Sequence, residues 1–151
     1  MERLRLWRGM THEERVVAAT AALRSATLDF YEDGWSLEDS VANISPIALA
    51  DIIAQAVEEL LGIWELEWDY DADTDLVYGS SVATYWFKVS DPQTGCVLTH
   101  ETDNLTGEKL HYCRFIETLC DAVQAIVDLA DIIAEKLPVS RSQVTSLKEV
   151  K

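Results

Sequence analysis

The sequence predicts an α+β fold, with two N-terminal helices, an antiparallel meander of three to four strands, and a long C-terminal helix packed on the sheet. Three observations predict it. Capping signals open two helical segments before residue 62. Residues 63–75 then alternate apolar and acidic side chains, which is the period of a strand. Residues 113–137 contain neither Gly nor Pro and are predicted to form the last helix.

The first helix begins at a capping box. Thr11 is followed three residues later by Glu14, so that each side chain can bind a free backbone N–H group of the first turn. The helix is predicted to continue through RVVAATAALRSATLDFY and to end by Gly34. At helical spacing its inner face consists of Val16, Ala19, Leu23, Ala26 and Phe30.

The second helix has equally clear limits. Ser45 is an N-cap, Pro46 occupies the first helical position, and Gly62 ends the helix. The helical period places one set of apolar side chains toward the core: Ile53, Val57, Leu60 and Leu61. It places Asp51, Gln55 and Glu58 toward water.

The functional argument depends on residues 63–75, IWELEWDYDADTD. Alternation at period two predicts a half-buried strand. Its apolar side consists of Trp64, Leu66, Trp68 and Tyr70. Its other side is predicted to present a single file of carboxylates with no Lys or Arg among them: Glu65, Glu67, Asp69, Asp71, Asp73 and Asp75.

The remaining strands follow from β-branched residues and turn signals. Residues 76–90 are predicted to form one long strand, with a possible interruption at Gly79. Residues 91–95, DPQTG, predict a turn, and residues 96–101 the next strand. After a second turn at 103–107, residues 109–112 are predicted to pair back, which would place Cys96 opposite Cys113.

The last helix is predicted to run from about Cys113 to Leu137. One line along it is polar and mostly acidic: Glu117, Asp121, Gln124, Asp128, Asp131 and Glu135. The rest is mostly apolar, and so wide an apolar arc predicts burial on two sides, by the sheet and by either another helix or a second subunit. Acids four residues apart repel each other, and Lys136 is the only lysine on the helix.

Length and composition favour one folded domain. The chain has 151 residues, of which 48% are hydrophobic. We divide it into a basic N-terminal segment, residues 1–10, a single α+β domain, residues 11–137, and a flexible C-terminal tail, residues 138–151. No apolar run approaches the roughly 18 residues of a membrane span. Three cysteines are too few for a disulfide framework, so we expect a cytoplasmic protein.

The net charge of −15 is unevenly distributed. Residues 1–8 and residues 138–151 each contain three basic residues and one Glu, so each end carries +2. The body, residues 9–137, therefore carries −19. Such a field repels nucleic acid and speeds association with basic surfaces. Direct binding of nucleic acid is thus disfavoured, whereas acidity that serves solubility alone remains an alternative.

No motif of enzymatic chemistry is present. The sequence lacks a nucleophile elbow, a phosphate loop, a dinucleotide fingerprint and a zinc-protease motif. The series from Asp69 to Asp75 begins like a calcium loop but has Thr74 where glycine is required and Ser80 where a bidentate Glu is needed. On an extended strand Cys96 and His100 are roughly 13 Å apart, too far for one zinc ion. We therefore predict no enzyme, no cofactor and no metal.

Binding is the function that the sequence favours. We expect a basic protein surface as the partner, in particular that of a nucleic-acid-binding protein, and no membrane. The candidate partner-binding residues come from the strand and the last helix: Glu65, Glu67, Asp69, Asp71, Asp73, Asp75, Glu117, Asp121, Asp128, Asp131 and Glu135. In its physical character the chain resembles the DNA-mimic and anti-defence proteins of phages and mobile elements, which are small, acidic and poor in motifs. The resemblance is one of properties and implies an inhibitor that presents carboxylates in place of phosphates.

Two other functions remain open. One is a small-molecule-binding α+β protein or enzyme with an aromatic pocket between sheet and helices, lined by Trp64, Trp68, Tyr85, Trp86 and Phe87. The other is an acidic subunit of a larger complex, with a possible homodimer through the C-terminal helix. A pocket with a titratable group of perturbed pKa would favour the first of these alternatives.

Overall fold

The computed structural model describes residues 2–27, 41, 44–64, 66–77, 80–93, 96–98 and 112–136. Its elements in chain order are helices α1 (Glu2–Gly9), α2 (His12–Ala26) and α4 (Pro46–Leu61), strands β1 (Glu67–Val77), β2 (Ser80–Asp91), β3 (Cys96–Leu98) and β4 (Tyr112–Ile116), and helix α5 (Leu119–Lys136). Helices precede and follow an antiparallel sheet, which confirms the predicted α+β class.

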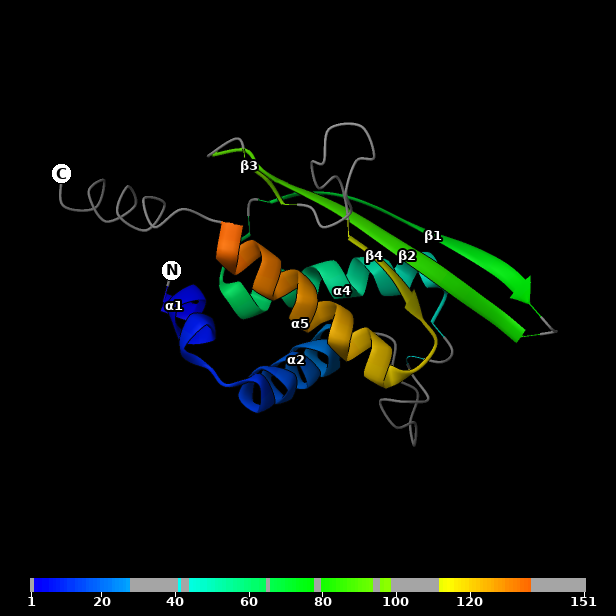
Figure 1. Ribbon diagram of the computed structural model, residues 1–151, viewed down its shortest axis with the longest axis horizontal. Coiled ribbons are helices and arrows are strands. Elements are labelled where there is room, and N and C mark those ends of the chain that lie inside the picture. The colour runs from blue at the N-terminus through cyan, green and yellow to red at the C-terminus, as the bar shows by residue number, and fades with distance from the viewer. Residues whose placement is uncertain are drawn as a thin grey trace.

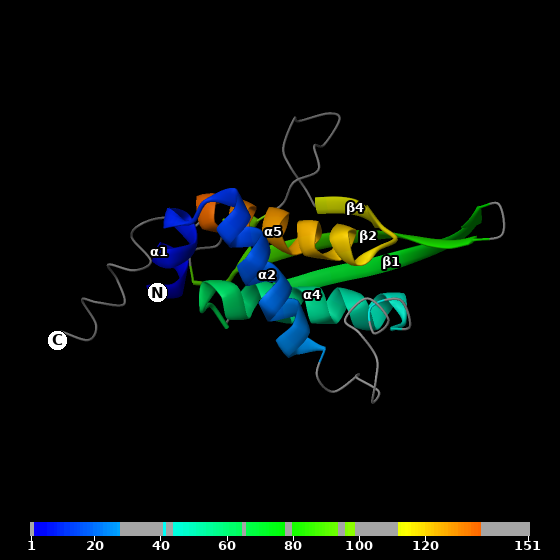
Figure 2. The same cartoon turned by 90° about the horizontal axis from the view of Figure 1, so that it is seen from below.

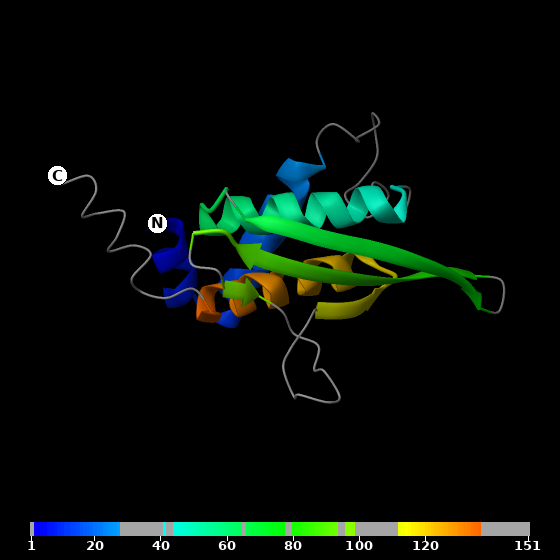
Figure 3. The same cartoon turned by 90° about the horizontal axis from the view of Figure 1, so that it is seen from above.

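The described helices lie on one side of the sheet (Figure 1). α4 and α5 pack directly against the strands, and α2 crosses both of these helices on the side away from the sheet (Figure 2). In the opposite view the sheet lies in front, with no described helix over it (Figure 3). One face of the sheet is therefore covered by helices, and no described helix covers the other, which we call the open face.

The sheet has β2 at its centre, and β1, β2 and β3 form the predicted antiparallel meander, whereas β4 joins β2 outside that order. β1 pairs with β2 along the full length of both strands, and Val77 lies opposite Ser80. Of the predicted strand 76–90, Leu76 and Val77 belong to β1 and the rest from Ser80 belongs to β2, so the division falls where the sequence allowed an interruption. β3 and β4 both pair with the other edge of β2, near opposite ends of that strand, and do not pair with each other.

This topology corrects the predicted pairing of Cys96 with Cys113. Cys96 lies opposite Asp91, whereas Cys113 lies opposite Trp86. Five residues of strand separate these two positions, or roughly 16 Å. A disulfide requires Cα atoms less than about 7 Å apart, so the two cysteines cannot be joined without rearrangement of the sheet.

The helix starts follow their capping signals. The Thr11 side chain accepts a hydrogen bond from the Glu14 backbone, and the Glu14 carboxylate accepts one from the Thr11 backbone, which confirms the capping box. α4 begins at Pro46 and ends at Gly62, whose φ of 66° is in the left-handed region that glycine favours. The predicted end of the first helix, near Gly34, lies outside the described residues.

α5 begins later than predicted. Residues 112–116 form β4, and α5 starts only at Leu119. Thr118 and Asp121 exchange hydrogen bonds at this start, as the residues of a capping box do. The segment from Cys113 was assigned to the helix because it lacks Gly and Pro, but its β-strand is stabilised by pairing with β2, a contact that local sequence does not encode.

The basic N-terminal segment forms an additional helix. α1 packs against the ends of α4 and α5, and its Leu4 and Trp7 side chains are buried. The structure thus has three described helices before the sheet where the sequence predicted two. The predicted C-terminal tail, residues 138–151, lies outside the described residues.

The core lies between the sheet and the helices. Phe87 at its centre is fully buried and contacts the rings of Trp68, Tyr70 and Tyr112. The helices contribute fully buried aliphatic side chains to the same cluster: Leu23, Ile52, Ile53, Val57, Leu61, Ile126, Leu129 and Ile133.

Candidate functional site

The open face of the sheet carries the predicted strand acids. Glu67 and Asp69 are exposed, while Trp68 between them packs against Phe87 in the core. The period-two alternation of this part of the chain is therefore confirmed. Within the described part of the chain, neither carboxylate makes a hydrogen bond or an ion pair. The two acids are free to meet a partner.

Other residues share the open face. Lys88 lies directly opposite Asp69 in the strand register and is also exposed. Phe115 of β4 is 50% exposed, and it lies opposite Thr84, two positions along β2 from Trp86. Because alternate residues of a strand share a face, the open face combines charged and aromatic side chains.

The remaining strand candidates are only partly described. Asp71, Asp73 and Asp75 occupy alternate positions of β1, opposite Trp86, Thr84 and Val82 of β2. Glu65 lies outside the described residues. The backbone thus continues the register of Glu67 and Asp69 as far as Val77.

Trp64 was predicted to lie on the buried face of the strand, and this prediction is wrong. It precedes β1 and is 62% exposed, whereas Ile63 and Leu66 on either side of it are buried. The alternation was assumed to begin at residue 63, but the strand starts only at Glu67 after the left-handed turn at Gly62.

The acidic line of α5 is largely bound within the chain. Asp128 accepts hydrogen bonds from the Tyr112 hydroxyl at 2.6 Å and from the Gln124 amide at 2.7 Å, and Arg114 lies 3.5 Å away. Burial and then the bond to Asp128 raise the pKa of Tyr112. The Asp121 carboxylate lies 3.7 Å from Arg114.

Asp131 has two partners near the N-terminus. The indole N–H of Trp7 donates to Asp131 at 2.9 Å, and the Arg15 guanidinium lies 3.1 Å from the same oxygen and stacks over the Trp7 ring. The predicted helix offered Lys136 as its only lysine, but arginines approach three of its acids: Arg114 of β4 lies beside Asp121 and Asp128, and Arg15 of α2 lies beside Asp131. Glu117 and Glu135 are exposed.

A half-buried carboxylate lies on the helical side of the molecule. Glu58 was predicted to face water, but it lines a cavity of about 320 Å³ between the end of α2 and α4. Burial raises its pKa to about 7, an effect that Trp68 partly opposes and Asp51 reinforces. Among the described residues the buried Nε1 of Trp68 has no hydrogen-bond partner of ordinary geometry, although its N–H is close enough to Glu58 to influence that pKa.

Replacing Glu58 should therefore stabilise the protein in a pH-dependent manner. The folded protein holds a proton on Glu58 up to about pH 7, whereas the unfolded chain releases it near 4.5, so stability falls as the pH rises between these values. We expect Glu58→Gln to increase the free energy of unfolding at pH 8 by about 1 kcal/mol, a value reduced for the solvent screening of a half-exposed group. Urea unfolding at pH 5 and pH 8 measures this difference.

The gain in the free energy of unfolding from Glu58→Gln should be several-fold smaller at pH 5. This pH still lies above the isoelectric point of about 4.4. Glu13→Gln on the exposed first turn of α2 is the matched control and should leave stability unchanged at both values. A gain that is equal at the two pH values would contradict a neutral Glu58 in the folded protein.

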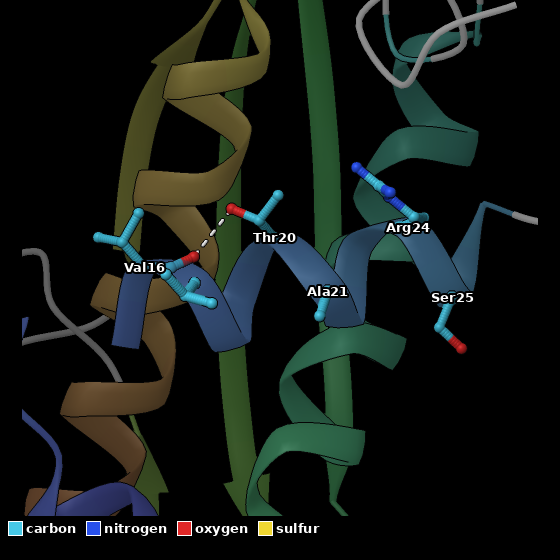
Figure 4. A pocket seen from close by; sticks show the side chains of 6 residues that line it. Val16, Thr20, Ala21, Arg24 and Ser25 are labelled. Atoms are coloured by element: carbon cyan, nitrogen blue, oxygen red, sulfur yellow. Dashed lines mark hydrogen bonds between the residues drawn. The ribbon is translucent and has the colours of Figure 1, made fainter. Parts of the chain in front are cut away.

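A second cavity, of about 540 Å³, lies along α2 (Figure 4). Its described lining comes entirely from one helix: Val16, Val17, Thr20, Ala21, Arg24 and Ser25. Thr20 donates its hydroxyl to the Val16 carbonyl and is thus bound within the helix. No convergent set of titratable groups lines the described part of this cavity.

The predicted aromatic pocket is not formed by the predicted residues. Tyr85 and Phe87 are buried in the core, Trp86 occupies a position of the opposite face, and Trp64 is exposed. Of the described residues, no three His, Cys, Asp or Glu side chains are grouped so as to hold a metal ion. His100 and His111 lie outside the described ranges.

None of the helices in the described part of the chain is both long and apolar enough to cross a membrane. No protein-family model matches the sequence, and comparison with curated proteins and with solved structures finds no significant similarity.

Proposed function

We propose that the protein is a non-enzymatic, cytoplasmic binding module whose open sheet face receives a basic surface of a partner protein. The observation that carries this proposal is the exposure of Glu67 and Asp69 on a face that no described helix covers, without partners in the described part of the chain. Exposed carboxylates that bind no described side chain are available for a partner. The negative field of the whole chain, −15, would speed its approach.

In its finer form the proposal is that the module inhibits a nucleic-acid-binding protein. Side chains at alternate positions of a strand repeat about every 6.6–6.8 Å, which is comparable with the spacing of phosphates along one nucleic-acid strand. β1 carries an acid at each alternate position from Glu67 to Asp75. Lys88 offsets part of this charge. It would also fix the orientation of the partner, since a basic side chain of the partner placed over Lys88 would be repelled.

The open face also offers apolar anchors. Phe115 is half-exposed there, and aromatic side chains are enriched in the centres of protein interfaces. The acids of α5 contribute less, because Asp121, Asp128 and Asp131 already hold Arg114, Tyr112, Trp7 and Arg15. A homodimer through α5 is not needed to cover its apolar arc, since the sheet and the other helices bury it within one chain.

Charge reversal of the two free acids tests the proposal. We expect wild-type protein immobilised at low salt to capture a basic protein from extracts of its native host, and duplex DNA added as competitor to displace it. Glu67→Lys/Asp69→Lys should abolish capture while circular dichroism stays unchanged and the melting temperature falls by only a few degrees, because both side chains are exposed and the new lysine at position 69 faces Lys88. Captured protein should be released as the salt rises from about 0.05 to 0.5 M.

The matched control carries the same change of net charge elsewhere. Glu13→Lys alters an exposed acid on α2, on the helical side, and should capture the partner nearly as well as wild type, whereas Glu67→Lys alone, with the same change of net charge, should weaken capture. Equal loss in these two single variants would mean that overall charge, and not the sheet face, attracts the partner. Capture that duplex DNA cannot displace would leave a protein-binding module but exclude nucleic-acid mimicry.

A further inference from the structure

The described lining of the cavity beside Glu58 is rich in hydrogen-bond acceptors. It lies between α2 and α4, on the helical side of the sheet, and its described lining is Ser25, Ala26, Gln55, Glu58, Glu59 and Trp64. The Gln55 amide nitrogen already donates to Asp51 at 2.7 Å, which leaves its carbonyl oxygen as an acceptor. Two carboxylates and this amide oxygen outnumber the donors of the described lining, so the lining favours a ligand that supplies donors.

Trp64 supplies an aromatic wall. Its side chain is 62% exposed, whereas large aromatic side chains are usually well buried. In the chain it follows Ile63, the residue after the C-cap Gly62 of α4. An indole ring attracts a cation placed over its face, and most strongly where carboxylates lie close by and water is partly excluded. Because a planar guanidinium stacks on an aromatic ring better than a compact ammonium does, the wall favours a guanidinium group.

The charges around Glu58 leave it without a counter-ion. α4 contributes Asp51 and Glu59, both acidic, and β1 contributes Trp68 and Tyr70, of which Tyr70 donates its hydroxyl to Asp51 at 2.7 Å. From α1, Arg3 donates to the backbone carbonyl of Glu59. α2 contributes only the neutral Ser25 and Ala26 to the described lining. Among the described residues Glu58 thus forms no ion pair.

We propose that this cavity binds a guanidinium group, which stacks on Trp64 and donates its N–H groups to Glu58 and to the Gln55 carbonyl. The site does not depend on the binding proposed for the open sheet face, because it lies on the other side of the sheet. The guanidinium can belong to a free small molecule or to an arginine side chain of a peptide, and the two sources share this chemistry.

Titration calorimetry with two probes tests the site and distinguishes the sources. Agmatine represents the free small molecule, and a short uncharged peptide with one central arginine represents the side chain. Because a cation binds the ionised carboxylate and burial raises the Glu58 pKa to about 7, binding should be about tenfold tighter at pH 8 than at pH 6. 1,4-Diaminobutane, which keeps both charges of agmatine but replaces its guanidinium with a compact ammonium, should bind several-fold more weakly than agmatine.

Two variants separate the two walls of the cavity. Glu58→Gln should weaken binding at pH 8 at least tenfold and remove its pH dependence, and Trp64→Ala should weaken binding while keeping that dependence. Glu13→Gln should bind as wild type does. Binding of agmatine supports a small-molecule site, and binding of the peptide alone supports an arginine side chain. If neither probe binds at pH 8, or if Glu58→Gln binds both equally well, the proposal is wrong.

Discussion

Trp7→Ala is expected to lower the free energy of unfolding by about 3–5 kcal/mol, the usual cost of removing a fully buried tryptophan. Only 1% of the Trp7 surface is exposed. The variant loses the packing of the ring against the core, the hydrogen bond to Asp131 and the stacking of Arg15. For a chain of this length the melting temperature should fall by about 10–15 °C, measurable by calorimetry.

Two further variants show whether burial of the Trp7 ring accounts for the loss of stability. Leu6→Ala changes a side chain of α1 that is 57% exposed and should alter stability by no more than about 0.5 kcal/mol. Trp7→Phe keeps most of the apolar contact and removes the indole N–H, so it should cost less than Trp7→Ala. A loss below about 1 kcal/mol in Trp7→Ala would mean that α1 is not held against α4 and α5 in solution.

Helix limits could be predicted where the sequence carries a local signal. Thr11 with Glu14 defines the start of α2, and Pro46 with Gly62 defines both ends of α4. These positions are determined by backbone groups within one turn, so short-range chemistry is sufficient to find them. α1 was missed because three arginines dominate its composition, whereas its helix is stabilised by Trp7 and Leu4 packing on distant elements.

Strand pairing could not be predicted in the same way. Residues 76–90 were assigned to one strand with a possible interruption at Gly79, and β1 does end at Val77 while β2 begins at Ser80. Residues 113–116 of β4 were assigned to the last helix, because local composition cannot reveal that they pair with β2. This pairing joins segments far apart in the sequence, for which propensity is only a weak guide.

The candidate site was predicted in part for the same reason. Alternation correctly placed Glu67 and Asp69 on the exposed side of the strand, because period two is a local property. The bound state of Asp131 could not be inferred, since its partners are Trp7 and Arg15, more than a hundred residues away. Glu58 gave no signal in the sequence, because helical period places it near water and only the packing of α2 and Trp68 half-buries it.

Phe87→Ala is expected to destabilise the protein by about 3–5 kcal/mol. Phe87 is fully buried, and its ring centroid lies 6.1 to 6.4 Å from those of Tyr70, Trp68 and Tyr112, which belong to both neighbouring strands. Aromatic pairs at such distances add to the effect of buried area. These rings join β1 and β4 to β2, so the loss of stability should lower the midpoint of urea unfolding. In hydrogen exchange it should weaken the protection of the amides along β1.

Phe115→Ala is the matched comparison, because it removes the same side chain from the open face. Phe115 is 50% exposed, so its loss should cost about 1 kcal/mol or less, yet it should weaken capture of the basic partner if aromatic contact on that face contributes to binding. Phe87→Ala should impair capture only to the extent that it unfolds the protein. Full capture should therefore return at low temperature, or when an uncharged osmolyte that stabilises the folded state is added. The reverse result, in which Phe115 governs stability and Phe87 governs capture, would mean that the two faces of the sheet have been assigned the wrong way round.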